Sequence, residues 1–252
     1  MICAVMQPTY LPWLGYFNLI DSVEKFVFLD SVKLEKSDWH VRNRIKTTNG
    51  ELYLTVPIKN TKGRMHTLIS DAEIDQEKPW IKKHLKSIYY AYQKAPYFKE
   101  IYPLLEEIFS ANFRFLSELN IHFIKSICQQ LCIHSEFFIY SELEDICGEK
   151  EERLVGICNK VGCREYLSPR GAATYLEKEI PGGQLVKNDI RLFYQNFEHP
   201  QYTQLYGDFI GHLSIIDLLF NYGIKQSLAV IRSGCRPKID HLSFRNSNLD
   251  LN

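Results

Sequence analysis

Apolar and polar positions in the first thirty residues form short buried segments separated by polar junctions. Residues Ile2–Met6 are apolar or small, which is typical of one buried strand. A helical spacing of apolar residues follows Pro12, and Lys25–Leu29 forms a second apolar run that ends at Asp30. The order strand, loop, helix, strand predicts a βαβ unit, and such units build parallel sheets. We therefore expect an α/β fold with a parallel sheet core.

The junction between the first predicted strand and helix contains two prolines, which neither donate to a strand ladder nor continue a helix. In open parallel sheets, ligands bind at the carboxyl ends of the strands, where this junction lies. Two interpretations stay open: the junction is a packed aromatic corner, or it holds polar groups toward a ligand. The second interpretation predicts substrate contacts from Gln7, Tyr10 and Trp13, with Asp30 at the same edge.

A basic stretch follows Asp30 and contains Lys36, and Trp39 lies in its middle. If residues 39–45 are extended, then His40, Arg42 and Arg44 share one face of the strand. Guanidinium groups fit the oxygens of phosphate or carboxylate groups. The stretch is therefore either a solvated basic edge strand or an anion site.

Turn and periodicity signals place a hairpin and a helical insertion after this stretch. Asn49-Gly50 is a strong hairpin signal, so residues 43–48 and 51–58 are expected to pair as antiparallel strands. From residue 78 to residue 133 the apolar period is helical, which predicts an inserted helical block. We expect one domain over residues 1–245 and a disordered tail over residues 246–252.

The second informative junction spans Arg164–Leu176. Ser168 fits a helix N-cap after a short strand, Pro169 fits the first helical position, and Arg170 then lies in the first turn. A helix N-terminus with these residues binds anions readily, although an ordinary capped helix fits the pattern equally well. Gln201 lies further on in a turn-rich loop, and a helix is expected from residue 215 to residue 221, ending at Gly223.

Composition narrows the possible partners. The 252 residues carry 30 basic and 30 acidic side chains, so no global charge favours nucleic acid or an anionic membrane. The 7 cysteines are irregularly spaced and no signal peptide precedes the first strand, which favours reduced thiols in a cytoplasm. We expect no metal site and no membrane span, because neither ligand spacing nor a long apolar run is present. Of these classes of partner, a small molecule is therefore the one that we expect.

Several of the stretches above together resemble one family. They are Gln7–Phe17, Leu29-Asp30, Lys36, Trp39, Arg42–Arg44, Tyr166–Ser168 with Gly171, His199–Gln201, and Leu213–Asn221 with Gly223. This combination, which covers nearly the whole chain, is similar to the WbqC-like family. The resemblance implies a place in bacterial surface-polysaccharide (O-antigen) gene clusters and transfer of glycine to an amino sugar.

The chain also resembles nucleotidylyltransferases and pantothenate-synthetase-like ligases, but more weakly. Those enzymes carry a His-x-Gly-His motif where Trp13–Tyr16 stands here, and both histidines are absent. The strand–loop–helix–strand layout and the glycine are common to both, which implies a related fold. Use of ATP as a cofactor is left open by this resemblance.

The resemblance to the WbqC-like family leads to a hypothesis of an amide-forming transferase or ligase acting on a nucleotide-linked amino sugar. Asp30 or His40 would accept the proton of the amine. The residues expected to hold phosphates, a carboxylate, the sugar or the nucleotide are Gln7, Tyr10, Trp13, Lys36, Arg42, Asn43, Arg44, Ser168, Arg170 and Gln201. The alternatives are a non-catalytic sugar-nucleotide binding module and a nucleotidyltransferase. Homo-oligomerisation is left open.

Overall fold

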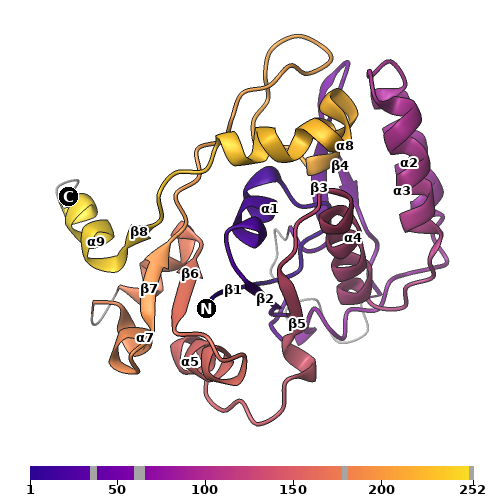
Figure 1. The fold of residues 1–252 in the computed structure, drawn as a ribbon. Helices are drawn as coiled ribbons and strands as arrows, with labels where there is room; N and C mark the ends of the chain where they lie inside the picture. The colour runs from indigo at the N-terminus through magenta and orange to yellow at the C-terminus, as the bar shows by residue number, and fades with distance from the viewer. Residues whose placement is uncertain (35–38, 60–65, 178–180, 250–252) are drawn as a thin grey trace.

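A sheet in the strand order β5-β2-β1-β6-β7-β8 forms the centre of the fold (Figure 1). The computed structural model describes residues 1–34, 39–59, 66–177 and 181–249. The strands are β1 (Ile2–Met6), β2 (Lys25–Phe28), β5 (Glu136–Ile139), β6 (Glu165–Ser168), β7 (Arg191–Tyr194) and β8 (Ile239–Asp240). All neighbouring pairs are parallel except β7 and β8, which are antiparallel. The expected α/β fold with a parallel sheet core is confirmed.

Helices cover both faces of this sheet. They are α1 (Leu14–Asp21), α2 (Trp80–Tyr92), α3 (Phe98–Ser110), α4 (Leu116–Gln130), α5 (Lys150–Lys160), α6 (Ala173–Leu176), α7 (Gly183–Lys187), α8 (Ile215–Ser233) and α9 (His241–Leu249), with 3₁₀ turns η2 (Tyr140–Glu142) and η3 (Arg170–Ala172). In Figure 1, α1, α4 and α8 lie on one side of the central strands, and α5 and α7 lie on the other. The fold is therefore layered, with the sheet in the middle.

The alternation of side chains along the strands divides the core in two. Ala4 and Phe26 belong to the cluster formed with α1, α4 and α8, whereas Cys3, Val5 and Val27 pack with α5 and α7. Strands that are buried on both faces have continuous apolar runs, and not alternating ones. This is why Ile2–Met6 contains no polar position.

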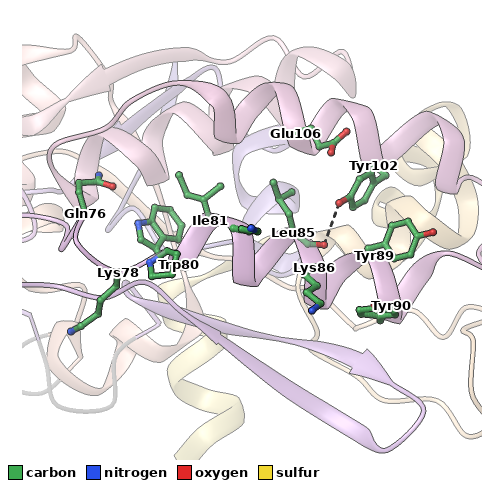
Figure 2. A pocket seen from close by; sticks show the side chains of 12 residues that line it. Gln76, Lys78, Trp80, Ile81, Leu85, Lys86, Tyr89, Tyr90, Tyr102 and Glu106 are labelled. Atoms are coloured by element: carbon green, nitrogen blue, oxygen red, sulfur yellow. Dashed lines mark hydrogen bonds between the residues drawn. The ribbon is translucent and has the colours of Figure 1, made fainter.

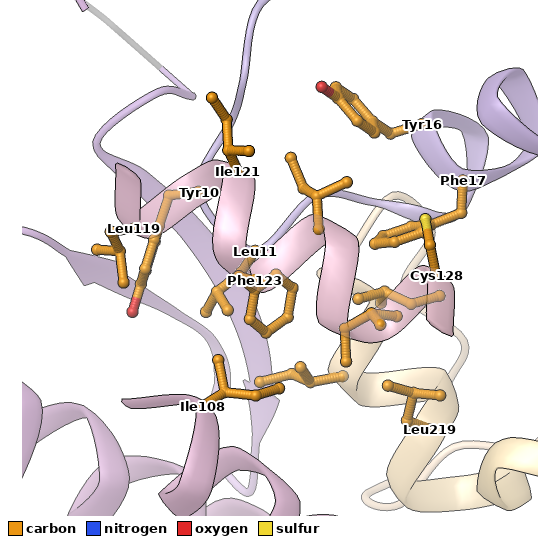
Figure 3. Packing of buried hydrophobic residues seen from close by; sticks show 14 of the residues in the cluster. Tyr10, Leu11, Tyr16, Phe17, Ile108, Leu119, Ile121, Phe123, Cys128 and Leu219 are labelled. Carbon is orange, nitrogen blue, oxygen red and sulfur yellow. The ribbon is translucent and has the colours of Figure 1, made fainter. Parts of the chain in front are cut away.

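The hairpin and the helical block lie beside the first core cluster. Strand β3 (Arg42–Thr47) pairs with β4 (Gly50–Thr55), and Gly50 turns the chain with a φ of 94°. This confirms the expected hairpin, because a two-residue turn of this kind requires a residue with positive φ. Helices α2, α3 and α4 occupy the stretch in which an inserted helical block was expected. Figure 3 shows how α4 packs against the loop that follows β1.

The strand order identifies the edge of the sheet at which a ligand is expected. Numbering only the parallel strands along the chain, the sheet order β5-β2-β1-β6-β7 runs 3-2-1-4-5. The order reverses between β1 and β6, so the loops that leave these two strands diverge. In doubly wound sheets, ligands bind outside the carboxyl ends of the strands at this reversal.

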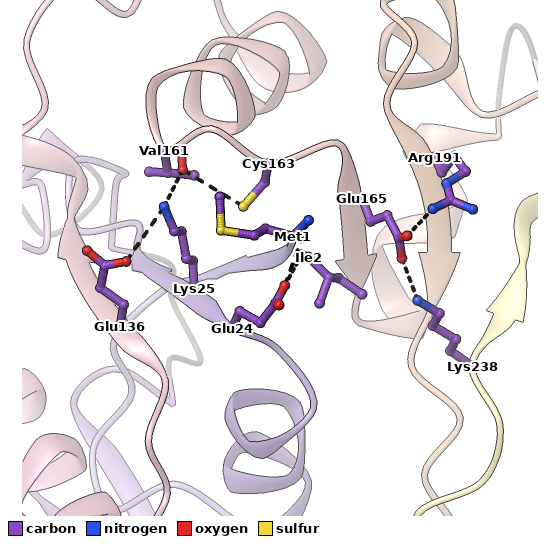
Figure 4. Close-up of polar contacts among 10 residues, drawn as sticks. All are labelled: Met1, Ile2, Glu24, Lys25, Glu136, Val161, Cys163, Glu165, Arg191 and Lys238. Carbon is purple, nitrogen blue, oxygen red and sulfur yellow. Dashed lines mark hydrogen bonds and ion pairs between the residues drawn. The ribbon is translucent and has the colours of Figure 1, made fainter.

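Ion pairs tie the strands at the opposite edge of the sheet, where the parallel strands begin (Figure 4). Lys25 of β2 lies 3.6 Å from Glu136 of β5 and also donates to the carbonyl of Val161. Glu165 of β6 accepts from Lys238 at 2.7 Å and pairs with Arg191 of β7. The hydrogen bond from Lys238 lowers the pKa of Glu165. The charged side chains named here are thus paired with one another at the amino edge of the sheet.

The junction after β6 differs from the expectation. Ser168 is the last residue of β6 and its hydroxyl lies 3.2 Å from the carbonyl of Pro169, so Ser168 is not a helix N-cap. Only the 3₁₀ turn η3 and the four-residue helix α6 follow. A helix this short lacks the aligned peptide dipoles that the expected anion site at its N-terminus requires.

The C-terminal region also differs in part. The helix that begins at Ile215 is interrupted at Gly223, whose φ of 69° and ψ of 172° are not helical, but it then continues to Ser233. Helix α9 extends to Leu249, so residues 246–249 of the expected disordered tail are helical. The rest of that tail is outside the described residues, and the assignment of one domain stays a prediction.

Candidate functional site

A pocket of about 240 Å³ lies beside the carboxyl end of β1. The loop after β1, helix α1, the hairpin and the segment before α8 all contribute to it. Its walls are formed by Met6, Thr9, Trp13, Tyr16, Trp39, Asn43, Arg44 and His212. The pocket is therefore on the edge of the sheet that the strand order identifies, and half of its wall residues are aromatic, with His212 included.

Hydrogen bonds to its carbonyl groups hold the loop after β1 in place. The buried amide of Asn43 donates to the carbonyls of Tyr10 (3.1 Å) and Leu11 (2.8 Å). Leu11 has a φ of 45°, which is uncommon for a residue with a side chain, so the loop needs this support. Asn120 of α4 donates to the carbonyl of Pro8 at 3.0 Å. These contacts come from two separate elements and make the loop a fixed wall.

Trp13 is held against helix α1 by the absence of a side chain at Gly15. A Cβ atom at Gly15 would overlap the six-membered ring of the Trp13 indole. The other contacts of the indole are aromatic: its ring is nearly parallel to that of His199, at 6.0 Å and 10°, and it lies 4.9 Å from that of His212. Phe197 meets it edge-on at 5.6 Å. Residues of the loop after β7 thus pack against Trp13, which follows β1.

A pair of histidines lies next to this indole. The backbone N–H of His212 donates to Nε2 of His199 at 3.1 Å, so Nε2 carries no proton. The proton is then on Nδ1 of His199, which donates to the carbonyl of Pro200 at 2.9 Å. Burial lowers the pKa of His199, and burial together with the charge of Arg44 lowers the pKa of His212. Both rings are therefore neutral at neutral pH.

Arg44 is the cation of the pocket and is fixed on several sides. Its Nη1 donates to Glu51 across the hairpin at 2.7 Å, and its Nη2 donates to the carbonyl of Gly211 at 3.3 Å. Its own carbonyl accepts from the backbone N–H of Ser214 at 3.0 Å. The guanidinium is thus held beside His212, which lies between Gly211 and Ser214 in the chain. A neutral base and a cation meet in one small aromatic cavity.

Three of the residues expected at the site meet in this pocket, namely Trp13, Asn43 and Arg44. Arg42 lies on the same hairpin, two residues from Arg44, outside the pocket wall. The wall does not include the side chain of Gln7, whose carbonyl accepts from the hydroxyl of Tyr16 at 3.0 Å.

Tyr10 points away from the pocket, into the core (Figure 3). Its ring is fully buried and its hydroxyl lies 2.8 Å from Nδ1 of His84 on α2. Leu11, which follows directly, has a φ of 45°, in the left-handed region. We therefore leave Tyr10 out of the proposed binding surface.

The two residues expected to act as a base also lie elsewhere. Asp30 follows β2 and is 2% exposed; its carboxylate accepts from the backbone N–H (3.0 Å) and the hydroxyl (2.6 Å) of Ser141. Through these two hydrogen bonds the carboxylate joins the end of β2 to η2. His40 is buried, and its carbonyl accepts from Asn120 at 2.9 Å. Neither side chain forms part of the pocket wall.

The remaining expected residues are dispersed. Arg170 is exposed and donates to Asn196 at 2.6 Å, which joins the loops after β6 and β7. Ser168 is buried beneath them, Gln201 is exposed, and neither lines the pocket. Lys36 is outside the described residues.

The sequence interpretation did not single out His212, Tyr16 or Met6 as site residues. It placed Thr9 at the ligand edge without giving it a role, and it named Trp39 only as the middle of the basic stretch. Trp39 carried a signal, because it is an aromatic residue among basic ones. His212 carried a weaker one, since it directly precedes the segment 213–221 that contributed to the family resemblance. Its φ of 57° and its contacts with Trp13 and Arg44 depend on the folded chain.

A larger hollow of about 690 Å³ lies along α2 and α3 (Figure 2). Aromatic side chains such as Trp80, Tyr89 and Tyr102 line it together with lysines of α2. It is far more open than the pocket beside β1 and lies on two helices, away from the strand ends. Its described lining includes Glu106 and Tyr102, which can transfer protons, but it is not at the carboxyl ends of the parallel strands, where a ligand is expected.

Comparison with known proteins places the chain in a family. The model of the WbqC-like protein family matches residues 7–228. The chain belongs to that family. Its members are linked in general terms to polysaccharide-related biosynthesis. The uncharacterized protein Rv1507c of Mycobacterium tuberculosis is 35% identical over 222 residues, which cover 87% of this chain and 93% of that protein.

No solved structure matches the chain. The matched segment of this WbqC-like protein begins at Gln7 and therefore includes the whole loop after β1 as well as His212. Within the described part of the chain, no helix combines the length and apolar character needed to cross a bilayer. Over the same residues, no three His, Cys, Asp or Glu side chains are grouped closely enough to hold a metal ion.

Proposed function

We propose that the pocket beside β1 binds the amino-sugar part of a nucleotide-linked sugar and that the protein forms an amide on its amine. The reaction class is acyl or aminoacyl transfer, with glycine as the first donor to test. It agrees with the general link of the family to polysaccharide-related biosynthesis. The observation that carries the proposal is the meeting of neutral His212 with Arg44 in an aromatic pocket.

The size and walls of the pocket suit a single sugar ring. Its volume of about 240 Å³ is below the range of roughly 300–1,000 Å³ that is usual for drug-sized ligands, so a complete nucleotide sugar does not fit. Trp13, Trp39 and Tyr16 offer apolar faces to the C–H groups of a ring, while Asn43 and Thr9 are polar. Aromatic walls with a few oriented polar groups bind such half-polar ligands.

The two polar groups supply the chemistry that amide formation requires. The attacking amine forms the C–N bond and loses a proton. The bond from the acyl carbon to the phosphate or nucleotide of an activated acyl donor breaks, and that leaving group takes the bonding electrons. With free glycine, ATP supplies this activation. His212 is neutral because of its lowered pKa, so its ring accepts that proton. Arg44 stabilises the negative charge that develops on the acyl oxygen. Asp30 and His40 have no part in this assignment.

The test is a product assay by mass spectrometry. The protein is incubated with a UDP-linked amino sugar and glycine, with and without ATP, and the sugar nucleotide is examined for the mass of the added acyl group. His212→Ala and Arg44→Ala are expected to remove product. The matched controls are His134→Ala and Arg164→Ala, because both wild-type side chains are exposed and outside the pocket. Circular dichroism establishes that each variant is folded.

Each rival function has its own result in the same experiment. A thermal shift with the sugar nucleotide, but no product with any acyl donor, would support a non-catalytic binding module. Release of pyrophosphate in a magnesium-dependent reaction would support a nucleotidyltransferase. Full activity of the folded His212→Ala variant would refute the role given to that histidine.

A further inference from the structure

An exposed aromatic stack lies at the rim of the pocket. Trp39 and Tyr53 are 46% and 45% exposed, among the most exposed large aromatic side chains of the described chain. Their ring centroids are 6.4 Å apart and the rings are inclined by only 24°. Two large rings held nearly parallel and open to solvent form a platform on which a further flat ring stacks.

An arginine that has no carboxylate partner among the described residues adjoins this stack. The guanidinium carbon of Arg42 lies 5.0 Å from the centre of the Tyr53 ring. Among the described residues, no acidic side chain pairs with Arg42, and its Nε is buried without a hydrogen-bond partner. By contrast, Arg44 on the same strand is paired with Glu51. Arginine that is stacked but not neutralised is well suited to bind phosphate oxygens.

The platform and the pocket form one continuous surface. Arg44 is directly opposite Tyr53 in the hairpin, so the side chains of Arg42, Arg44 and Tyr53 lie on the same face. Arg44 and Trp39 are both part of the pocket wall, and the Arg44 guanidinium lies 6.0 Å from the Trp39 ring. A ligand that fills the pocket and extends beyond its mouth on this side therefore reaches the surface that carries Trp39, Tyr53 and Arg42.

We propose that Trp39, Tyr53 and Arg42 bind the nucleoside diphosphate of the substrate, with the base on the aromatic stack and the diphosphate against Arg42. The inference rests on the proposed function in assuming that the sugar is linked to a nucleotide. It accounts for the part of such a substrate that a cavity of about 240 Å³ excludes. Binding of a free nucleoside diphosphate needs no turnover, so it is measured independently of the proposed reaction.

The experiment is a titration of the full-length protein with UDP and with UMP, followed by calorimetry and by tryptophan fluorescence. Nucleotide stacked on Trp39 is expected to quench fluorescence in the wild type and not in Trp39→Phe, which retains an aromatic ring. Trp39→Ala and Tyr53→Ala are each expected to weaken UDP binding about 5-fold or more, the usual effect of losing a base-stacking ring. Tyr53→Phe is expected to bind as the wild type does.

Arg42 is tested by the difference between the two nucleotides. If Arg42 contacts the diphosphate, UDP binds more tightly than UMP to the wild type, and Arg42→Ala removes most of this difference. The controls are Arg164→Ala and Tyr90→Ala, which alter exposed side chains outside the pocket and the platform. GDP and ADP in parallel report whether the stack selects a base.

Two outcomes would overturn the inference. One is the absence of UDP binding to the wild type at millimolar concentration, and the other is binding that is unaffected in folded Trp39→Ala and Arg42→Ala. UDP binding that depends on these residues, without amide formation, would support the inference while refuting the proposed reaction. Amide formation by Arg42→Ala with an unaltered KM for the nucleotide sugar would support the proposed reaction while refuting the inference.

Discussion

The stability of the protein should depend on pH through His84, the residue that holds the hydroxyl of Tyr10. His84 is 6% exposed, and burial lowers its pKa from 6.5 to about 4. In the unfolded chain the same ring binds a proton near pH 6.5. Between pH 6.5 and about 4 the unfolded state therefore binds more protons, and stability falls as the pH is lowered.

The size of this effect follows from the two pKa values. A pKa that falls from 6.5 to about 4 corresponds to about 3 kcal/mol at 1.36 kcal/mol per unit. This stability is fully present above pH 6.5 and is lost as the pH approaches 4. We expect urea denaturation of the wild type to show a loss of this order between pH 7 and pH 4.

Two variants distinguish the contribution of His84 to this pH dependence from that of other titratable groups. His84→Gln cannot titrate, so the loss of stability on acidification is expected to be about 3 kcal/mol smaller than in the wild type. Tyr10→Phe keeps the buried histidine but removes the hydroxyl near its Nδ1, at 2.8 Å. We expect Tyr10→Phe to be destabilised by about 1–3 kcal/mol at pH 7 and to retain its dependence on pH.

Equal pH dependence in the wild type and His84→Gln would refute the reasoning. It would assign the acid sensitivity to His199 and His212, whose pKa values are also lowered.

Three further predictions concern the loop after β1 and its surroundings. Gly15→Ala places a methyl group against the indole of Trp13, so we expect about 1–3 kcal/mol of destabilisation in thermal unfolding and weaker binding of the amino sugar. Asn43→Ala leaves two loop carbonyls without their donor, and we expect a loss of about 2–4 kcal/mol in urea denaturation. Asp30→Asn weakens the contacts with Ser141, so we expect lower stability by about 1–2 kcal/mol but unchanged rates in the product assay. A large loss of rate in a stable Asp30→Asn variant would restore that carboxylate as a candidate base.

The parts of the fold that the sequence predicted correctly depend on local signals. The apolar run of Ile2–Met6 indicates a strand that is buried on both faces, and the structure places β1 inside the parallel sheet. Asn49-Gly50 sets the hairpin because the turn itself demands positive φ. Trp13 could be placed near the ligand edge for a similar reason, since the residues that follow a parallel strand gather there.

The parts that the sequence could not predict depend on contacts between distant segments. The strand rule placed Tyr10 at the same edge as Trp13, but the Tyr10 ring is fully buried in the core, where its hydroxyl lies 2.8 Å from Nδ1 of His84. Asp30 ends a strand, as an active-site residue often does, yet it accepts two hydrogen bonds from a segment 111 residues away. The pKa of His212 is lowered by burial and then by the charge of Arg44, which is even more remote in the sequence. Arg44 contacts Gly211 and Ser214, on either side of that histidine. Such partners are not encoded in any local pattern.

The basic face of β3 illustrates how one pattern leads to three different roles. Lys46, Arg44 and Arg42 alternate along the strand and share a face. Lys46 is 2% exposed, and its ammonium donates to Gln204 and to the carbonyl of Asp208, at 3.2 and 2.5 Å, so it holds the loop before α8 on the hairpin. Arg44 is paired and forms the pocket wall, and Arg42 has no acidic partner among the described residues. Lys46 is thus bound by neutral oxygens, Arg44 is paired with the carboxylate of Glu51, and the guanidinium of Arg42 has neither kind of hydrogen-bond partner among the described residues. A negatively charged ligand is therefore expected to approach the Arg42 end of β3, where no acidic side chain of the described residues neutralises the guanidinium.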